Sequence, residues 1–160
     1  AHATKRLPLA KLVAICQGIN CPVLLLGGPD DRNVGEQIAD QAGAHVLNTC
    51  GQYSLHQSAS LVGQSRLVIT HDTGLMHIAA ALRKPIVSVW GSTIPEFGMT
   101  PFYPEGMDHN TSVEVKNLSC RPCSKIGYAA CPKGHFSCMA NIDLQKITSI
   151  AELSAAEKIS

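Results

Sequence analysis

Four short apolar runs with helical patterns between them constrain the fold of this 160-residue chain more than any other feature. The runs are rich in valine, isoleucine and leucine and cover residues 22–26, 45–47, 67–70 and 86–90. Apolar residues recur at helical spacing in the segments 8–16, 31–42, 54–62 and 74–82. Strands and helices that alternate in this way form a parallel sheet with right-handed crossovers. The sequence therefore predicts an α/β fold, a Rossmann-like parallel sheet flanked by helices.

The last third of the chain departs from this alternation. Residues 97–141 contain four prolines and four cysteines, so we expect a long irregular excursion there. A final helix is predicted after Asp143, which is placed to cap it, because apolar residues then recur every three positions as far as Leu153. We expect residues 1–160 to form one domain, a length that buries a core without disulfide or metal support.

Charge and hydropathy exclude several classes of protein. Thirteen basic and twelve acidic residues give a net charge of +1, which argues against a nucleic-acid binder. No apolar run approaches the ~20 residues that span a bilayer. The chain begins at Ala1 without an initiator methionine or a signal peptide, so we expect it to be a segment of a longer protein.

Three of the predicted strands are followed by loops that combine glycine with polar residues. These loops are 27–30, 71–74 and 91–93. Ligands of open parallel sheets bind outside the carboxyl ends of the strands, and those ends share one edge. We therefore expect the functional site at this edge.

Asp72 is the most informative residue of the edge, because it is the only acidic residue between Asp40 and Glu96. One interpretation is that Asp72 or Thr73 caps the helix that begins at Gly74. The other is that the helix N-terminus binds an anionic ligand, with Asp72 beside it. Both interpretations use the same local geometry.

The backbone N–H groups of residues 73–75 would then face a phosphate, which the helix dipole also attracts. Gly74 allows close approach, and His77 returns to the same face of the first turn. Asp72 would repel a diphosphate, so we assign it to a neutral group such as a sugar hydroxyl. Lys5, with Arg6 beside it, is the predicted counter-charge, because the next helix opens near Pro8 and could bring it to the same edge. The alternative is that these two residues are solvated charges near the start of the chain.

Other readings of these motifs are weaker. Asp72-Thr73-Gly74 is also the triplet of aspartic proteases, but an Ala-rich helical run follows it here. His71, Asp72 and His77 do not share one helical face as metal ligands would. Residues 27–30 lack the spacing of a dinucleotide fingerprint or a P-loop.

The seven cysteines fall into two groups. Cys16, Cys21 and Cys50 are expected to be buried thiols, and the odd total favours a reducing compartment. The second group could hold tetrahedral zinc or remain free, and its members are Cys120, Cys123, Cys131 and Cys138. The same excursion is basic, which suits either an anionic acceptor or membrane surface, or simple solvation. Its basic residues are Lys116, Arg121, Lys125 and Lys133.

The chain resembles, over nearly its whole length, the C-terminal half of the ADP-heptose:lipopolysaccharide heptosyltransferases of glycosyltransferase family 9. The most specific resemblance runs from Asp72 through the Ala-rich helix to Leu82, then Pro85, then Trp90-Gly91-Ser92-Thr93 with Pro95. Supporting motifs are Thr4-Lys5-Arg6 with Pro8, residues 27–30, and Cys120-x-Pro122-Cys123. Family members typically have Gly-Pro-Thr in place of Gly91-Ser92-Thr93.

The resemblance implies the C-terminal half of a GT-B fold, with a cleft against an N-terminal acceptor domain that this chain lacks. It makes Lys5 and Asp72 the catalytic residues, Lys5 facing the diphosphate. The remaining donor-binding residues it implies are Thr73, Gly74 and His77 at the helix, Tyr53 and Leu55 near the adenine, and Gly28 and Asp30 near the nucleoside.

The implied reaction is inverting transfer of heptose, or a related sugar, from an ADP-activated donor to the lipopolysaccharide core. The resemblance implies no required cofactor, a general base in the absent domain, and a cytoplasmic location at the inner membrane. We expect the chain alone to bind donor weakly without turnover. The alternatives are a non-catalytic nucleotide-sugar-binding module with a zinc-stabilised loop and, with less support, a nucleotide-sugar epimerase.

Overall fold

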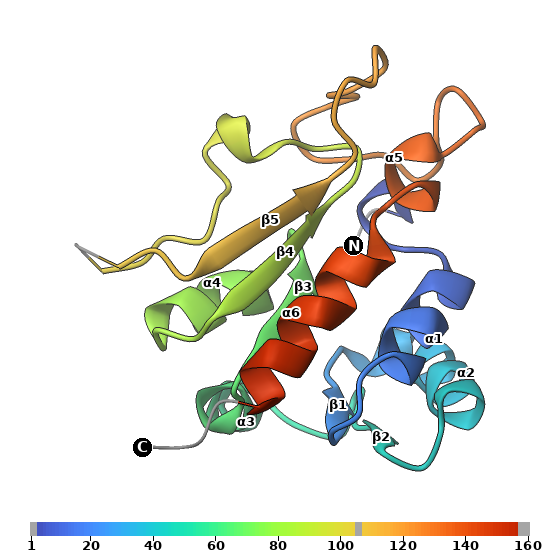
Figure 1. The fold of residues 1–160 in the computed structure, drawn as a ribbon. Helices are drawn as coiled ribbons and strands as arrows, with labels where there is room; N and C mark the ends of the chain where they lie inside the picture. The colour runs from blue at the N-terminus through green and yellow to red at the C-terminus, as the bar shows by residue number, and fades with distance from the viewer. Residues whose placement is uncertain (1–2, 105–106, 157–160) are drawn as a thin grey trace.

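The computed structural model describes residues 3–104 and 107–156, and within them five parallel strands lie among helices (Figure 1). The strands are β1 (Val23–Leu25), β2 (Val46–Asn48), β3 (Val68–His71), β4 (Ile86–Trp90) and β5 (Asn110–Glu114). β1 pairs with β2, while β4 lies between β3 and β5 in a second ladder. The predicted fold class is confirmed, with the difference that the strands form two separately hydrogen-bonded sheets.

Six α-helices and three short 3₁₀ turns connect the strands in the part of the chain that the structure describes. The α-helices are α1 (Leu9–Gln17), α2 (Arg32–Ala42), α3 (Leu55–Gln64), α4 (Gly74–Ala81), α5 (Ser137–Ala140) and α6 (Leu144–Ala156). The 3₁₀ turns are η1 (Ala3–Lys5), η2 (Pro29–Asp31) and η3 (Pro95–Phe97). None of the described helices is both long enough and apolar enough to cross a membrane.

Local chemistry explains where several helices begin and end. Ser54 and Gln57 form a reciprocal capping box at the start of α3. Gly43 follows α2 with φ of +122°, a conformation that favours glycine. The carboxylate of Asp143 accepts a hydrogen bond from the N–H of Lys146, which confirms the predicted cap of α6.

The core lies on both faces of the central strand β4, all of whose residues are buried. On one face, Val87 and Val89 pack with apolar residues that include Met139 and Ile147 of α5 and α6. On the other face, a cluster around Trp90 includes residues of α3 and α4. Because both faces of β4 are covered, its sequence is apolar almost throughout, as is usual for buried parallel strands. β4 thereby fixes the position of the loop that follows it.

The segment 97–141, predicted to be irregular, contains β5 and the short helix α5. β5 was missed because it reads Asn-Thr-Ser-Val-Glu, without the apolar pattern of a strand. Only Val113 of this strand is fully buried. Its polar side chains form hydrogen bonds on the sheet, such as the 3.3 Å contact between the hydroxyls of Ser88 and Ser112. Pairing with β4 thus decides the structure of a segment whose own sequence does not.

Candidate functional site

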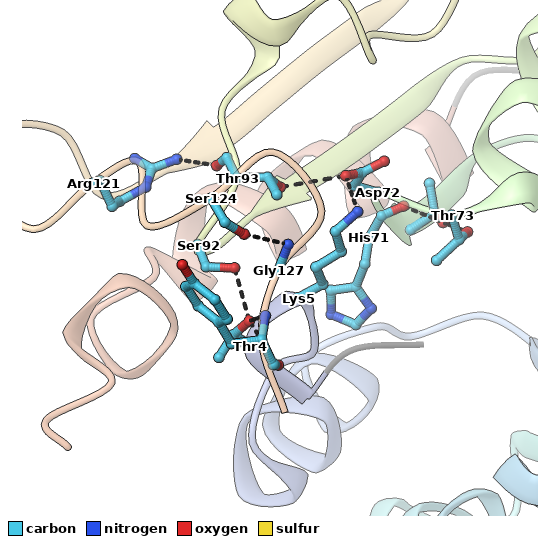
Figure 2. Close-up of polar contacts among 12 residues, drawn as sticks. Thr4, Lys5, His71, Asp72, Thr73, Ser92, Thr93, Arg121, Ser124 and Gly127 are labelled. Atoms are coloured by element: carbon cyan, nitrogen blue, oxygen red, sulfur yellow. Dashed lines mark hydrogen bonds and ion pairs between the residues drawn. The ribbon is translucent and has the colours of Figure 1, made fainter. Parts of the chain in front are cut away.

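The carboxyl ends of β3 and β4 meet the turn η1 at the predicted edge of the sheet. Lys5 of η1 and Asp72 after β3 form an ion pair there, with 2.6 Å between Nζ and Oδ2 (Figure 2). Both side chains are largely buried, with 13% of the Lys5 side chain and 5% of the Asp72 side chain exposed. The predicted arrival of Lys5 at this edge is therefore confirmed, over a sequence separation of 67 residues.

The contact between these two charges differs from the sequence interpretation, which gave Lys5 to a phosphate and Asp72 to a neutral group. Oδ2 of Asp72 accepts the Lys5 ammonium and also the hydroxyl of Thr93 at 3.3 Å. The reason is electrostatic: a buried carboxylate requires a nearby cation or hydrogen-bond donors. An anionic ligand at this edge must therefore compete with Asp72 for the ammonium.

His71, the last residue of β3, holds the chain that carries Lys5. Its Nε2 accepts a hydrogen bond from the backbone N–H of Leu7 at 3.0 Å, so its ring proton lies on Nδ1. Burial, together with the nearby positive charge of Arg6, lowers the pKa of His71 to about 4. His71 is thus a neutral acceptor that orients the backbone two residues after Lys5, a role the sequence did not reveal.

The N-terminus of α4 lies next to Asp72 and is not capped by a side chain of the described residues. Thr73 occupies the N-cap position, but its hydroxyl contacts the hydroxyl of Thr70 at 3.2 Å. The interpretation in which Asp72 or Thr73 caps this helix is therefore wrong. Gly74 and His77 are exposed, and a Cβ on Gly74 would find no atom within 4 Å. The protein itself leaves this helix end open.

The loop after β1 reaches the same edge through Asp31, which the sequence analysis did not single out. Asp31 accepts the N–H of Gly28 at 3.0 Å and pairs with Arg6 at 3.1 Å. Asp30, the residue predicted to approach a nucleoside, is exposed in the same turn. The Arg6–Asp31 pair links the residue that follows η1 to η2.

Leu55 is the first residue of α3 and Tyr53 precedes the helix by two residues, and both are exposed. Tyr53 lines a surface pocket of about 220 Å³ together with Gln57, Ser60 and Leu61. This volume is below the ~300–1,000 Å³ of ordinary ligand pockets. The structure therefore shows these two residues as free surface and does not bring them into the hydrogen-bonded group around Asp72.

Thr4 anchors η1 from the other side, although the sequence analysis gave it no role of its own. This residue is only 2% exposed. Its hydroxyl donates to the carbonyl of Tyr128 at 3.0 Å and accepts from the N–H of Tyr128 and from the hydroxyl of Ser92. The backbone N–H of Ser92 also donates to the carbonyl of Thr4 at 3.3 Å. The residue before Lys5 is therefore held by two distant loops.

Arg121 has a structural position that the sequence interpretation missed. We expected it to offer charge to an acceptor or to solvent, together with the three lysines of the excursion. Its side chain is instead 6% exposed and paired with Glu114 at 2.9 Å. Lys116, Lys125 and Lys133 are exposed. The basic surface therefore consists of these lysines without Arg121.

The cysteines are all free thiols. Cys16 and Cys50 are buried as predicted, whereas Cys21, predicted to be buried with them, is only half-buried. Burial raises the pKa of Cys16 to about 11. Backbone N–H groups, above all that of Phe136, lower the pKa of Cys131. Within 3–104 and 107–156, no three His, Cys, Asp or Glu side chains are arranged to hold a metal ion. Zinc uptake by Cys120, Cys123, Cys131 and Cys138 stays a prediction, which metal analysis of the purified chain would test.

Comparison with known proteins shows which family the sequence matches. Residues 2–131 match the model of glycosyltransferase family 9 (heptosyltransferase). The chain is 36% identical over 94 residues to lipooligosaccharide heptosyltransferase 2 of Haemophilus ducreyi, which covers 55% of this chain and 27% of that protein. It is 34% identical over 79 residues to lipopolysaccharide heptosyltransferase 2 of Escherichia coli, covering 47% of this chain and 23% of that protein.

Two solved structures share the fold. The ADP-heptose lipopolysaccharide heptosyltransferase II of E. coli superposes with a TM-score of 0.70 at 24% identity, covering 96% of this chain and 42% of that one. A family 9 glycosyl transferase of Veillonella parvula gives 0.73 at 20% identity, covering 99% and 44%. The alignments thus span about a quarter of the curated relatives named above and less than half of the solved chains.

Proposed function

Since this chain belongs to glycosyltransferase family 9, as its motifs predicted, we propose that it is the donor-binding half of a heptosyltransferase. The donor is ADP-heptose or a related ADP-activated sugar, and the acceptor is the lipopolysaccharide core. The names of the relatives support this choice of reaction. The remaining half of a GT-B enzyme, an N-terminal domain, would carry the acceptor and close the cleft.

One observation carries the proposal: the open N-terminus of α4 begins two residues after a buried aspartate that is paired with a lysine. The free N–H groups at the start of α4 and the Lys5 ammonium offer a diphosphate both hydrogen bonds and positive charge. Gly74 leaves room for this approach, because no protein atom lies where its side chain would be.

The geometry suggests how the donor would engage. The ammonium of Lys5 would turn from Asp72 to the diphosphate oxygens, since phosphate carries the larger negative charge. Asp72 would keep its contact with the Thr93 hydroxyl and accept a hydrogen bond from a sugar hydroxyl. His77 would flank the phosphate from the first turn of α4. The ion pair would thus be exchanged for two contacts with the donor.

In the reaction, the bond between the anomeric carbon and the diphosphate oxygen breaks, and its electron pair leaves with ADP. The acceptor hydroxyl oxygen bonds to the anomeric carbon from the opposite face, which inverts the configuration. Lys5 and the helix N–H groups stabilise the charge that develops on the leaving oxygen. The hydroxyl proton passes to a general base that we place in the N-terminal domain. The proposal assigns charge neutralisation to these protein groups and names no cofactor.

The nucleoside would extend from the diphosphate across the neighbouring strand ends. We place the ribose near Gly28 and Asp30, in the loop held by the Arg6–Asp31 pair. The adenine would lie against Tyr53 and Leu55, whose exposed side chains offer an apolar surface. The exposed lysines of the excursion would face lipopolysaccharide or the inner membrane from the cytoplasm.

Calorimetric titration of the 160-residue chain tests this proposal. ADP and ADP-heptose should bind weakly, UDP-sugars should bind more weakly still, and heptose transfer should be absent. Lys5→Ala should lose at least tenfold in ADP affinity, because hydrogen bonds to charged groups contribute about 1.5–3 kcal/mol. Lys11→Ala, which removes a half-buried lysine of α1, is the matched control and should bind as wild type does. A wild-type chain that ignores every nucleotide would contradict the proposal.

A further inference from the structure

The guanidinium of Arg121 uses its donors on the backbone of the loop that follows β4. Nε donates to the carbonyl of Gly91 at 2.5 Å, and Nη2 donates to the carbonyl of Thr93 at 2.9 Å. Nη1 donates to the carbonyl of Val115 at 2.7 Å, and Nη2 also contacts the carboxylate of Glu114. The guanidinium thus makes four contacts with acceptors of the protein itself. We therefore do not assign it to the binding of an anionic ligand.

The loop 91–93 contacts Asp72 directly and reaches Lys5 through the neighbouring residue Thr4. Thr93 donates its hydroxyl to Asp72, while Ser92 donates its hydroxyl at 2.9 Å to Thr4, the neighbour of Lys5 (Figure 2). The N–H of Cys123 donates to the carbonyl of Ser92 at 2.9 Å. The segment that carries Arg121 therefore forms hydrogen bonds with all three residues of the loop 91–93. The position of the loop therefore sets the spacing of the two charges.

We infer that Arg121 is a positioning residue of the donor site, which acts through the loop 91–93 on both Lys5 and Asp72. Its planar fork reaches two carbonyls of one loop at a fixed spacing, which a lysine ammonium cannot reproduce. Its charge is neutralised by Glu114, so its effect on the site is geometric rather than electrostatic. The donor that this site receives rests on the proposed function; the positioning of the ion pair does not.

The first test needs no ligand. A lysine ammonium gives a proton–nitrogen NMR signal only when hydrogen bonding and burial slow its exchange with water, as the Lys5–Asp72 pair should. Lys5→Arg identifies the signal by its loss. Arg121→Lys should broaden or abolish it, whereas Arg32→Lys, the same change at an exposed site of α2, should leave it intact.

The second test separates positioning from stability. Arg121→Lys should weaken ADP binding about tenfold, the effect expected from displaced hydrogen bonds to charged groups. Ile147→Val removes one buried methylene from the core contacts of α6 and should lower the midpoint of unfolding without weakening ADP binding. Thr93→Val, which keeps the shape of the side chain, should reproduce part of the Arg121→Lys effect on its own.

A double-mutant cycle of Arg121→Lys and Thr93→Val tests whether Arg121 acts on the site through Thr93. If Arg121 acts through Thr93, the double variant should bind ADP less than twofold more weakly than Arg121→Lys alone. A Lys5 signal and an ADP affinity that both survive Arg121→Lys would overturn the inference. If the wild-type protein fails to bind ADP, the proposed function is contradicted instead. The NMR comparison would still test the role of Arg121. Folding of each variant is checked by its thermal transition, and if Arg121→Lys does not fold, Thr93→Val carries the test.

Discussion

The ammonium of Lys5 lies 2.6 Å from the carboxylate of Asp72, which joins the first turn of the chain to the end of β3. Removing Lys5 and removing Asp72 should have opposite effects on the binding of an anionic ligand. Without Lys5 a buried carboxylate is left with one neutral donor, and without Asp72 the ammonium becomes available to another anion.

Asp72→Asn should therefore keep or raise the affinity for ADP, because the carboxylate that competes for Lys5 and repels phosphate is gone. The same variant should lose its preference for ADP-heptose over ADP, since the proposed acceptor of a sugar hydroxyl is weakened. Calorimetry with both ligands measures the two effects. A fall in ADP affinity as large as that of Lys5→Ala would contradict the competition between carboxylate and phosphate.

Gly74→Ala should separate folding from binding. The open space at Gly74 predicts that alanine is accommodated and stabilises α4 by up to ~1 kcal/mol in urea unfolding. Its Cβ should obstruct the phosphate and weaken ADP binding at least tenfold. Gly63→Ala in α3, where the Cβ would lie 3.9 Å from Leu82, is the control, and should bind ADP normally. Equal ADP affinities in the two variants would place the phosphate elsewhere.

Acid should destabilise the fold through His71. Its pKa in the folded state is about 4, against 6.5 for an unperturbed histidine, so the unfolded chain binds the proton more readily. The contribution is therefore present above pH 6.5 and is lost as the pH falls from there towards 4, by roughly 3 kcal/mol. His71→Gln removes the titration and should flatten this part of the curve of unfolding free energy against pH. Parallel curves for the two proteins would argue against a neutral His71.

Thr4→Val should destabilise the chain by about 1–3 kcal/mol, because the backbone N–H of Tyr128 and the buried hydroxyl of Ser92 lose their acceptor. Thr4→Ser keeps the hydroxyl and should cost about 1 kcal/mol at most, the transfer energy of one methyl group. Urea unfolding of the two variants measures the difference. If valine costs no more than serine, the hydroxyl does not hold η1.

Sequence reasoning succeeded where local pattern and topology agree. The apolar run at β3 and the rule that parallel strand ends share an edge placed Asp72 at this edge, and the helix predicted to open near Pro8 brought Lys5 to it. It failed where tertiary partners decide the outcome. β5 has a polar sequence and depends on β4 for its structure.

The role of Arg121 was missed for a related reason. A basic residue among prolines and cysteines resembles a solvated loop charge, and only the packed structure brings it against Glu114 and the carbonyls after β4. The direct contact between Lys5 and Asp72 was also missed, because we assigned a partner to each residue with a diphosphate already bound at the edge. The spacing of residues along the sequence does not show which group a charged side chain contacts, or whether that contact forms before a ligand binds.

The most direct test of the central claim is a crystal structure of this chain with ADP bound. We predict that the terminal phosphate lies against the backbone N–H groups at the start of α4, and that Lys5 Nζ has moved from Asp72 into hydrogen-bond distance of a phosphate oxygen. A diphosphate bound away from Gly74, with the Lys5–Asp72 pair unchanged, would contradict the account.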